Sequence, residues 1–233
     1  MDDPTETSGS NAEAPVRKRS KVVERLNAQA KSGGIQLGPA IDPDLKEFTV
    51  VIFGVPRGGT TMVAGVAEKT GLNIGEALGH NLEDADFDRT TAEHMQAAIA
   101  ERNSRLPVWG WKYPSASTYL AGLIPFLRNP RFVVVWRDPL TAAIRSVEDV
   151  KRQGLRHEAE TRRAMQAVEA MVARQMNNVA LLKQAGVPAL LVSYEKAVRR
   201  PQEFIEQLAG FMSMPVPENM AEVIAFMEPE SYK

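Results

Sequence analysis

The chain has 233 residues and a mass of 25.6 kDa, with 44% hydrophobic and 24% charged residues, a composition typical of one soluble globular domain. The formal net charge of −1 provides no overall basic field, so we expect no nucleic-acid partner. The lack of cysteine excludes disulfides, thiolate catalysis and thiolate metal sites, and three scattered histidines give no reason to expect a metal.

Residues 1–45 are expected to form a flexible N-terminal tail, because they are polar and lack a sustained apolar period. Within the tail, KVVERLNAQAK (residues 21–31) could form a short amphipathic helix. The chain starts with an acidic, polar segment, and no apolar run reaches the length of a membrane span. We therefore expect a cytoplasmic protein without an integral membrane segment.

From residue 48 onward, apolar strands alternate with helical patterns, which predicts a single domain over residues 46–233. The expected fold class is an α/β three-layer sandwich with a mostly parallel central sheet. Strands are predicted at residues 49–53, 108–111, 132–136 and 189–192, and helices at residues 61–70, 92–103, 158–184, 201–212 and 218–226. Thr90 and Glu93 have the spacing of a capping box before the second helix. The long helix carries a stripe that we expect to pack in the core, formed by Met165, Val168, Val172, Met176 and Val179.

The stretch FTVVIFGVPRGGTTMVAGV (residues 48–66) has the layout of a phosphate-binding loop, a buried strand followed by a glycine turn and a helix. The N–H groups of such a loop converge with the positive end of the helix, so an anion can bind there. An ATP-binding Walker loop needs lysine at the position of Thr60, whereas the nearest cation here is Arg57. The loop therefore indicates a phosphate ligand of lower charge than ATP.

The segment GVPRGGTT resembles the 5′-phosphosulfate loop of bacterial-type sulfotransferases that use 3′-phosphoadenosine 5′-phosphosulfate (PAPS). The resemblance implies a P-loop NTPase-like sulfotransferase fold. It also implies that Arg57 binds the sulfuryl and 5′-phosphate oxygens, together with the other cofactor-binding residues of the loop, Pro56, Gly58, Gly59, Thr60 and Thr61.

Two later segments resemble further cofactor motifs of this family. RFVVVWRDPLTAAIRSVED is similar to the 3′-phosphate motif, which implies that Arg137 and Ser146 hold the 3′-phosphate. Ser146 lies one position later than the usual serine, where this chain has Arg145, so Arg145 is an alternative. VSYEKAVRRPQEFIEQLAGFMSMP is similar to the strand and helix that place a tyrosine near adenine. Tyr194 is thus either an adenine contact or a tyrosine at the edge of the core.

The candidate catalytic residues come from two other segments that resemble the family. VWGWKYPSAS places Lys112 at the end of a strand, where it would lie near the sulfuryl group or be a surface lysine. GHNLEDADF places Glu83 as the expected general base, with His80 next, although a solvated acidic loop is the alternative. Arg57 would stabilise the charge of the leaving group.

The sequence thus predicts an enzyme that transfers the sulfuryl group of PAPS to a hydroxyl or amine of a small-molecule, carbohydrate or lipid acceptor. The product would be 3′,5′-ADP, and no metal is needed. The alternatives are a P-loop small-molecule kinase, with Asp138 as the Mg²⁺ ligand, and a non-catalytic nucleotide-binding protein of the same fold. The basic residues 151–156 could close over the 3′-phosphate, and a homodimer is left open.

Overall fold

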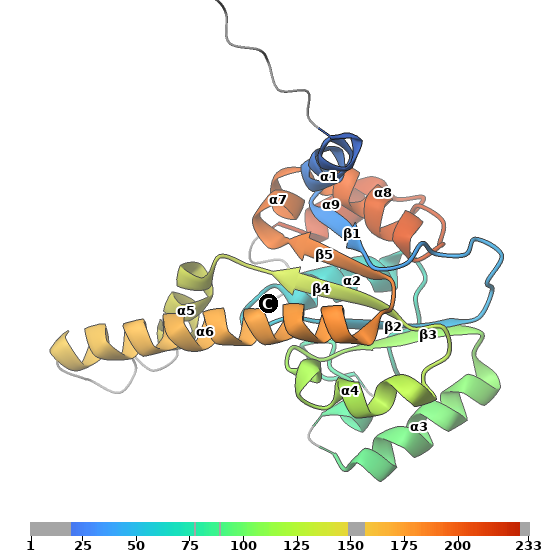
Figure 1. Cartoon of the computed structure of the whole chain (residues 1–233), viewed down its shortest axis with the longest axis horizontal. Coiled ribbons are helices and arrows are strands. Elements are labelled where there is room, and N and C mark those ends of the chain that lie inside the picture. Colours follow the sequence, from blue (N-terminus) through green and yellow to red (C-terminus); the bar gives the residue numbers. More distant parts are fainter. Residues whose placement is uncertain (1–19, 77, 89, 149–156, 229–233) are drawn as a thin grey trace, which may run out of the picture.

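The computed structural model describes residues 20–76, 78–88, 90–148 and 157–228 (Figure 1). Within these residues, five strands form one sheet in the order β1-β5-β4-β2-β3. The strands are β1 (Gly34–Leu37), β2 (Phe48–Phe53), β3 (Val108–Lys112), β4 (Arg131–Trp136) and β5 (Ala189–Ser193). The last four are parallel, and β1 is antiparallel to β5. The predicted α/β class with a mostly parallel sheet is confirmed, and all four predicted strands are present.

Helices cover both faces of the sheet, so the architecture has three layers (Figure 1). One face packs against α2 (Thr60–Lys69), α8 (Pro201–Phe211) and α9 (Met220–Phe226), and the other against α3 (Ala92–Arg105), α4 (Leu120–Leu123) and α6 (His157–Ala185). Val50 and Ile52 of β2 point into the first core, whereas Val51 and Phe53 point into the second. All of β2 is buried, as expected for a central strand of a sheet covered on both faces.

The remaining elements are short or lie at the margins of the sheet. They are α1 (Lys21–Lys31), α5 (Pro139–Glu148), α7 (Tyr194–Arg199) and three 3₁₀ turns, η1 (Ala85–Phe87), η2 (Ala116–Thr118) and η3 (Ile124–Phe126). No helix in the described parts of the chain is long and apolar enough to cross a bilayer.

The ordered fold begins earlier than the predicted boundary at residue 46. Helix α1 forms as anticipated, with Ser20 accepting a hydrogen bond from the N–H of Val23, and β1 then adds a strand to the edge of the sheet. Gln207 of α8 donates to the carbonyl of Gly34 at 3.0 Å, which fixes this strand to the domain. The prediction of a flexible tail through residue 45 is therefore wrong for residues 21–37. The strand was missed because GIQL is short and flanked by glycine, so it has no apolar alternation.

The predicted core stripe of α6 is wrong for three of its five residues, whereas Val168 is partly buried against the cluster of Val55, Ala142, Ala143 and Met171. Met165, Val172 and Met176 are 62%, 43% and 54% exposed, and the buried side chains are instead Met171, Gln175, Asn178 and Leu181. Figure 1 shows the first half of α6 beside α5 and beyond the edge of the sheet, so only the second half covers the sheet. The apolar period identified the helix correctly, but not the face that is buried.

The start of α3 differs from the predicted capping box by one residue. Thr91, rather than Thr90, is the N-cap, and its hydroxyl oxygen accepts a hydrogen bond from the N–H of His94. Thr90 instead donates to the carbonyl of Asp86 at 2.8 Å. The hydroxyl of Thr90 therefore joins the start of α3 to the segment before it.

Candidate functional site

The carboxyl ends of the four parallel strands meet at one edge of the sheet, where ligands of open α/β sheets bind. The phosphate loop follows β2, and Lys112 is the last residue of β3. Arg137 follows β4, and Tyr194 follows β5. The topology therefore brings residues from all three cofactor-like motifs and the candidate lysine to the same edge.

The phosphate loop is tightly folded against its own protein neighbours. The N–H of Gly58 donates to the carbonyl of Val55 at 2.9 Å, and Gly59 has a φ of 90° at the N-cap of α2. A Cβ at Gly54 would lie 2.6 Å from the carbonyl oxygen of Val135, and one at Gly59 would overlap the Tyr194 ring. These glycines are thus required by packing within the protein, and they hold the loop at the positive end of α2.

Arg137 connects the loop to the strand end of β4. Its side chain is buried, and Nη1 donates to the carbonyl oxygen of Arg57 at 3.0 Å. The guanidinium carbon lies 4.1 Å from the centroid of the Tyr194 ring, within the range of a cation–π contact. Ser146 lies in α5, but its side chain is outside the described residues, as are the basic residues 151–156.

Tyr194 is buried and belongs to the core that packs beneath the loop. Its ring contacts Arg137 and lies so close to Gly59 that no side chain would fit there. An adenine stacked on this ring would compete with the Arg137 guanidinium. The surroundings favour the alternative role of Tyr194, as a tyrosine at the core edge that supports the loop.

The structure brings Lys112 and Glu83 together. Lys112 Nζ lies 2.8 Å from Glu83 Oε1 and 2.7 Å from the carbonyl oxygen of Asn81. The lysine side chain is only 1% exposed, whereas that of Glu83 is 25% exposed. Burial lowers the pKa of Lys112, and the hydrogen bond and charge of Glu83 oppose that shift. Lys112 is therefore not a surface lysine.

The Lys112–Glu83 pair is linked to the phosphate loop through Asn81. The hydroxyl of Thr61, at the start of α2, donates to the same Asn81 carbonyl at 3.4 Å. His80, the other candidate base, precedes Asn81 and is exposed. The start of α2 and the Lys112–Glu83 pair are thus both held to the short segment that contains Asn81.

The rest of the acidic segment is held in place by an arginine that the sequence analysis did not single out. Arg102 of α3 pairs with Asp84 at 2.6 Å and with Asp86 at 2.7 Å, and the side chains of both Arg102 and Asp84 are buried. Its guanidinium also covers the rings of Phe87 and Trp109. The alternative of a solvated loop is therefore wrong for this segment, which is anchored and can position Glu83.

Two buried amides on α6 were also missed. Gln175 Nε2 donates to the carbonyl of Arg137 at 2.6 Å, and Asn178 Nδ2 donates to the carbonyl of Gly54 at 2.8 Å. Helix α6 thus fixes the backbone at both phosphate motifs, as expected for buried polar groups that need partners. The available signal was their spacing from Met171 and Leu181, which places all four on one face of the helix.

Asp138 caps the N-terminus of α5. Its Oδ1 accepts hydrogen bonds from the N–H and the hydroxyl of Thr141, both at 2.8 Å. These bonds lower the pKa of Asp138 below its ordinary value of 3.8, and the bond from the Thr141 N–H has the larger effect. A Mg²⁺ ion at this carboxylate would have to compete with the helix cap.

We expect the Asp138 cap to make stability pH-dependent. A lowered pKa contributes stability above the unfolded-state value of 3.8, which is lost as the pH falls through the folded-state value. Asp138→Ala should cost about 1 kcal/mol near neutral pH, and the difference from the unaltered chain should shrink below pH 3.8. Urea unfolding at a series of pH values measures this. Asp138→Asn, whose side chain can cap the helix but does not titrate, should lose less unfolding free energy at neutral pH. If the unfolding free energies of Asp138→Ala and the unaltered chain differed by the same amount at every pH, the assignment would be contradicted.

A match to a family model agrees with the resemblance noted in the sequence. A family model described as "Sulfotransferase family" matches residues 66–218. A solved structure, described as "Sulfotransferase Domain from the Curacin Biosynthetic Pathway", is 18% identical, with 77% of this chain and 78% of that one covered and a TM-score of 0.44. No curated protein matches the chain. The family match begins after the phosphate loop, so the interpretation of the loop depends on its own residues.

Proposed function

Because this chain belongs to the sulfotransferase family, we propose that it transfers the sulfuryl group of PAPS to a hydroxyl or amine of an acceptor and releases 3′,5′-ADP. The observation that carries the proposal is the contact between Arg137 and the phosphate loop, 3.0 Å from Nη1 to the carbonyl of Arg57. It joins the two motifs that would bind opposite ends of one adenosine bisphosphate.

On the donor side, the chain offers groups suited to two separate anions. The first-turn N–H groups of α2, with the hydroxyl of Thr60, favour an oxyanion at the loop, whereas the hydroxyl of Thr61 donates to the carbonyl of Asn81. Arg57, which is exposed, supplies the positive charge there. Arg137 suits a phosphate because a planar guanidinium can bind two oxygens at once. The Thr60 hydroxyl in place of the Walker lysine disfavours a kinase.

On the acceptor side, Glu83 is the group proposed to take the proton. The acceptor oxygen or nitrogen forms a bond to sulfur while the bond from sulfur to the 5′-phosphate oxygen breaks. The proton moves to Glu83, and the leaving phosphate oxygen keeps the electron pair beside Arg57. Lys112 is a positioning residue, since its 2.8 Å ion pair holds the Glu83 carboxylate in place. His80, exposed in the same segment, is the second candidate base.

Thermal unfolding with nucleotides tests the donor site. At about 100 times its Kd and without Mg²⁺, 3′,5′-ADP should stabilise the chain by roughly 3 kcal/mol, which corresponds to roughly 5–10 °C for a domain of this size. AMP, which lacks the 3′-phosphate, should give a smaller shift at the same concentration. A larger shift with Mg²⁺ and ATP would favour the kinase and overturn the proposal. Transfer of ³⁵S from labelled PAPS to a panel of alcohols, phenols, amines and glycans separates an enzyme from a non-catalytic nucleotide-binding protein.

A further inference from the structure

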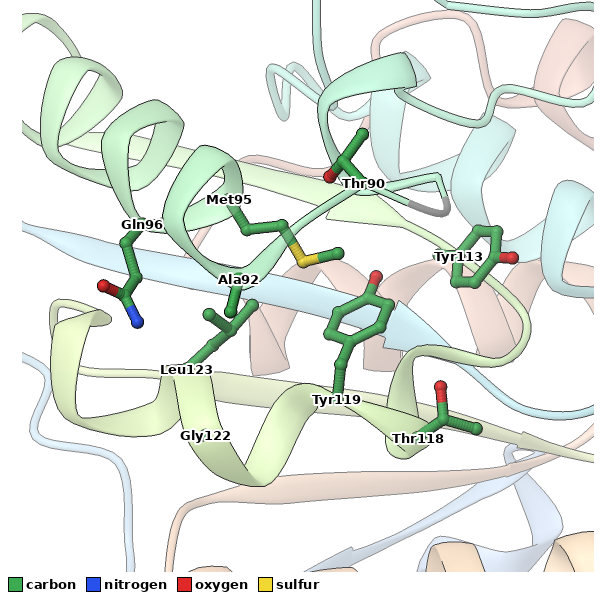
Figure 2. A pocket seen from close by; sticks show the side chains of 9 residues that line it. All are labelled: Thr90, Ala92, Met95, Gln96, Tyr113, Thr118, Tyr119, Gly122 and Leu123. Carbon is green, nitrogen blue, oxygen red and sulfur yellow. The ribbon is translucent and has the colours of Figure 1, made fainter.

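A cavity of about 300 Å³ lies between α3, α4 and the segment that follows β3 (Figure 2). Its volume is at the lower end of the range typical of small-molecule sites. The walls come from the start of α3 and from residues after the candidate lysine. They are formed by Thr90, Ala92, Met95, Gln96, Tyr113, Thr118, Tyr119, Gly122 and Leu123.

The lining is uncharged, and three of its hydroxyl groups donate to backbone carbonyls of the protein. Tyr119 donates to the carbonyl of Phe87 at 3.0 Å, Thr118 to that of Ser115 at 2.8 Å, and Thr90 to that of Asp86. The rings of Tyr113 and Tyr119 stack with centroids 5.9 Å apart. Apart from the Gln96 amide, such a cavity offers few hydrogen-bond donors to a ligand with many hydroxyls, whereas an apolar body has no hydrogen bonds with water to give up.

The cavity adjoins the candidate catalytic pair through the backbone. Tyr113 directly follows Lys112 at the carboxyl end of β3, so the two Cα atoms are about 3.8 Å apart. The Lys112 side chain shares the face of Ile52, its partner in register, and the cavity lies on the other face, so an acceptor would reach Glu83 around the end of β3. Tyr119 and Thr90 donate to Phe87 and Asp86, which continue the anchored segment that carries Glu83. Figure 2 shows Tyr113 at one side of the cavity and Gln96 at the opposite side. The end of the cavity at Tyr113 is thus the end nearest Lys112.

We propose that this cavity binds the apolar body of the acceptor, and that the acceptor is a compact alcohol or phenol rather than a glycan. The proposal rests on the proposed function, because it names the substrate class of that reaction. The acceptor hydroxyl would extend past Tyr113 toward Glu83. The uncharged lining and the aromatic stack select against charged or polyhydroxylated acceptors.

Gly122 lines the cavity, and a side chain can be added there without moving the backbone. It lies in α4, and a Cβ added there would meet no atom within 4 Å. Gly210 in α8 is a matched control, because a Cβ there also meets no atom within 4 Å and the residue does not line the cavity. Leucine at either position replaces a helical glycine, which favours the helix in both variants. A difference between Gly122→Leu and Gly210→Leu therefore reports on the cavity.

Binding of 2-naphthol to the purified full chain, followed by its fluorescence without any nucleotide, tests the proposal. The unaltered chain and Gly210→Leu should bind equally, and Gly122→Leu should bind at least roughly tenfold more weakly. In ³⁵S transfer to 2-naphthol, Gly122→Leu should raise KM by a similar factor, with an unchanged thermal shift by 3′,5′-ADP.

Three results would overturn the inference: no binding of 2-naphthol to the unaltered chain, equal binding to Gly122→Leu, or more efficient transfer to N-acetylglucosamine than to 2-naphthol. A missing thermal shift by 3′,5′-ADP in the unaltered chain would instead overturn the proposed function. The naphthol titration needs no nucleotide, so the two failures are distinguishable.

Discussion

The Glu83→Gln variant is expected to lose about 10²–10⁴-fold in kcat for sulfuryl transfer, the contribution typical of a general base. Glutamine keeps the size of the side chain and an oxygen that can accept the hydrogen bond from Lys112, which in the unaltered chain spans 2.8 Å. It cannot take the acceptor proton. Initial rates of ³⁵S transfer at saturating donor and acceptor measure the effect.

Glu76→Gln is the matched control for Glu83→Gln. Glu76 precedes the same segment and also forms an ion pair, 2.8 Å from Arg105, but it is 59% exposed. Exposed ion pairs of this kind contribute little to the free energy of unfolding, so turnover and stability of Glu76→Gln should stay close to those of the unaltered chain. Both variants should keep the thermal shift by 3′,5′-ADP. Full turnover by Glu83→Gln would remove Glu83 as the base and make His80 the residue to replace next.

Arg57→Ala is expected to reduce kcat about 10²–10³-fold, the loss typical when one group that stabilises transition-state charge is removed. The backbone of Arg57 has a φ of 59°, which is uncommon for residues that carry a Cβ. Alanine also carries a Cβ, so the substitution leaves this strain unchanged and removes the rest of the side chain with its charge. Single-turnover rates of ³⁵S transfer would separate loss of chemistry from weaker donor binding.

Arg200→Ala provides the control for the loss of one positive charge. Arg200 is exposed between α7 and α8, and its guanidinium lies 3.9 Å from the carboxylate of Glu203. Its removal should leave kcat and nucleotide binding unchanged. Turnover by Arg57→Ala at the rate of Arg200→Ala would show that the loop cation takes no part, and the sulfuryl site would have to lie elsewhere.

The fold class could be predicted because the central strands have strong local patterns. FTVVIF is apolar at every position except Thr49, and such a run is typical of a strand that is covered on both faces. The following glycine turn and helix start are visible from residue type alone, and α2 begins within one residue of the prediction. By contrast, GIQL lacks a pattern, and β1 forms because β5 offers a sheet edge.

The candidate site was predicted only in part. The residue types and their order pointed to Arg57, Arg137, Glu83 and Lys112, but not to how they contact one another. The burial of Lys112 depends on a segment 29 positions away in the sequence, which covers it and supplies Asn81 and Glu83. Tyr194 likewise could be placed at a strand end, whereas its contact with Arg137 required the arrangement of neighbouring strands.

The sequence by itself determined the four parallel strands and the longer helices, because the period of apolar side chains and the turn residues act over a few neighbouring positions. Tertiary structure decided which face of α6 is buried and which polar groups meet. Asn178 and Gly54 are 124 positions apart, and Gln175 and Arg137 are 38 apart, yet both pairs form hydrogen bonds. These bonds exist because buried amides must find partners wherever the packed helix places them, and that placement follows from the whole sheet rather than from any local pattern.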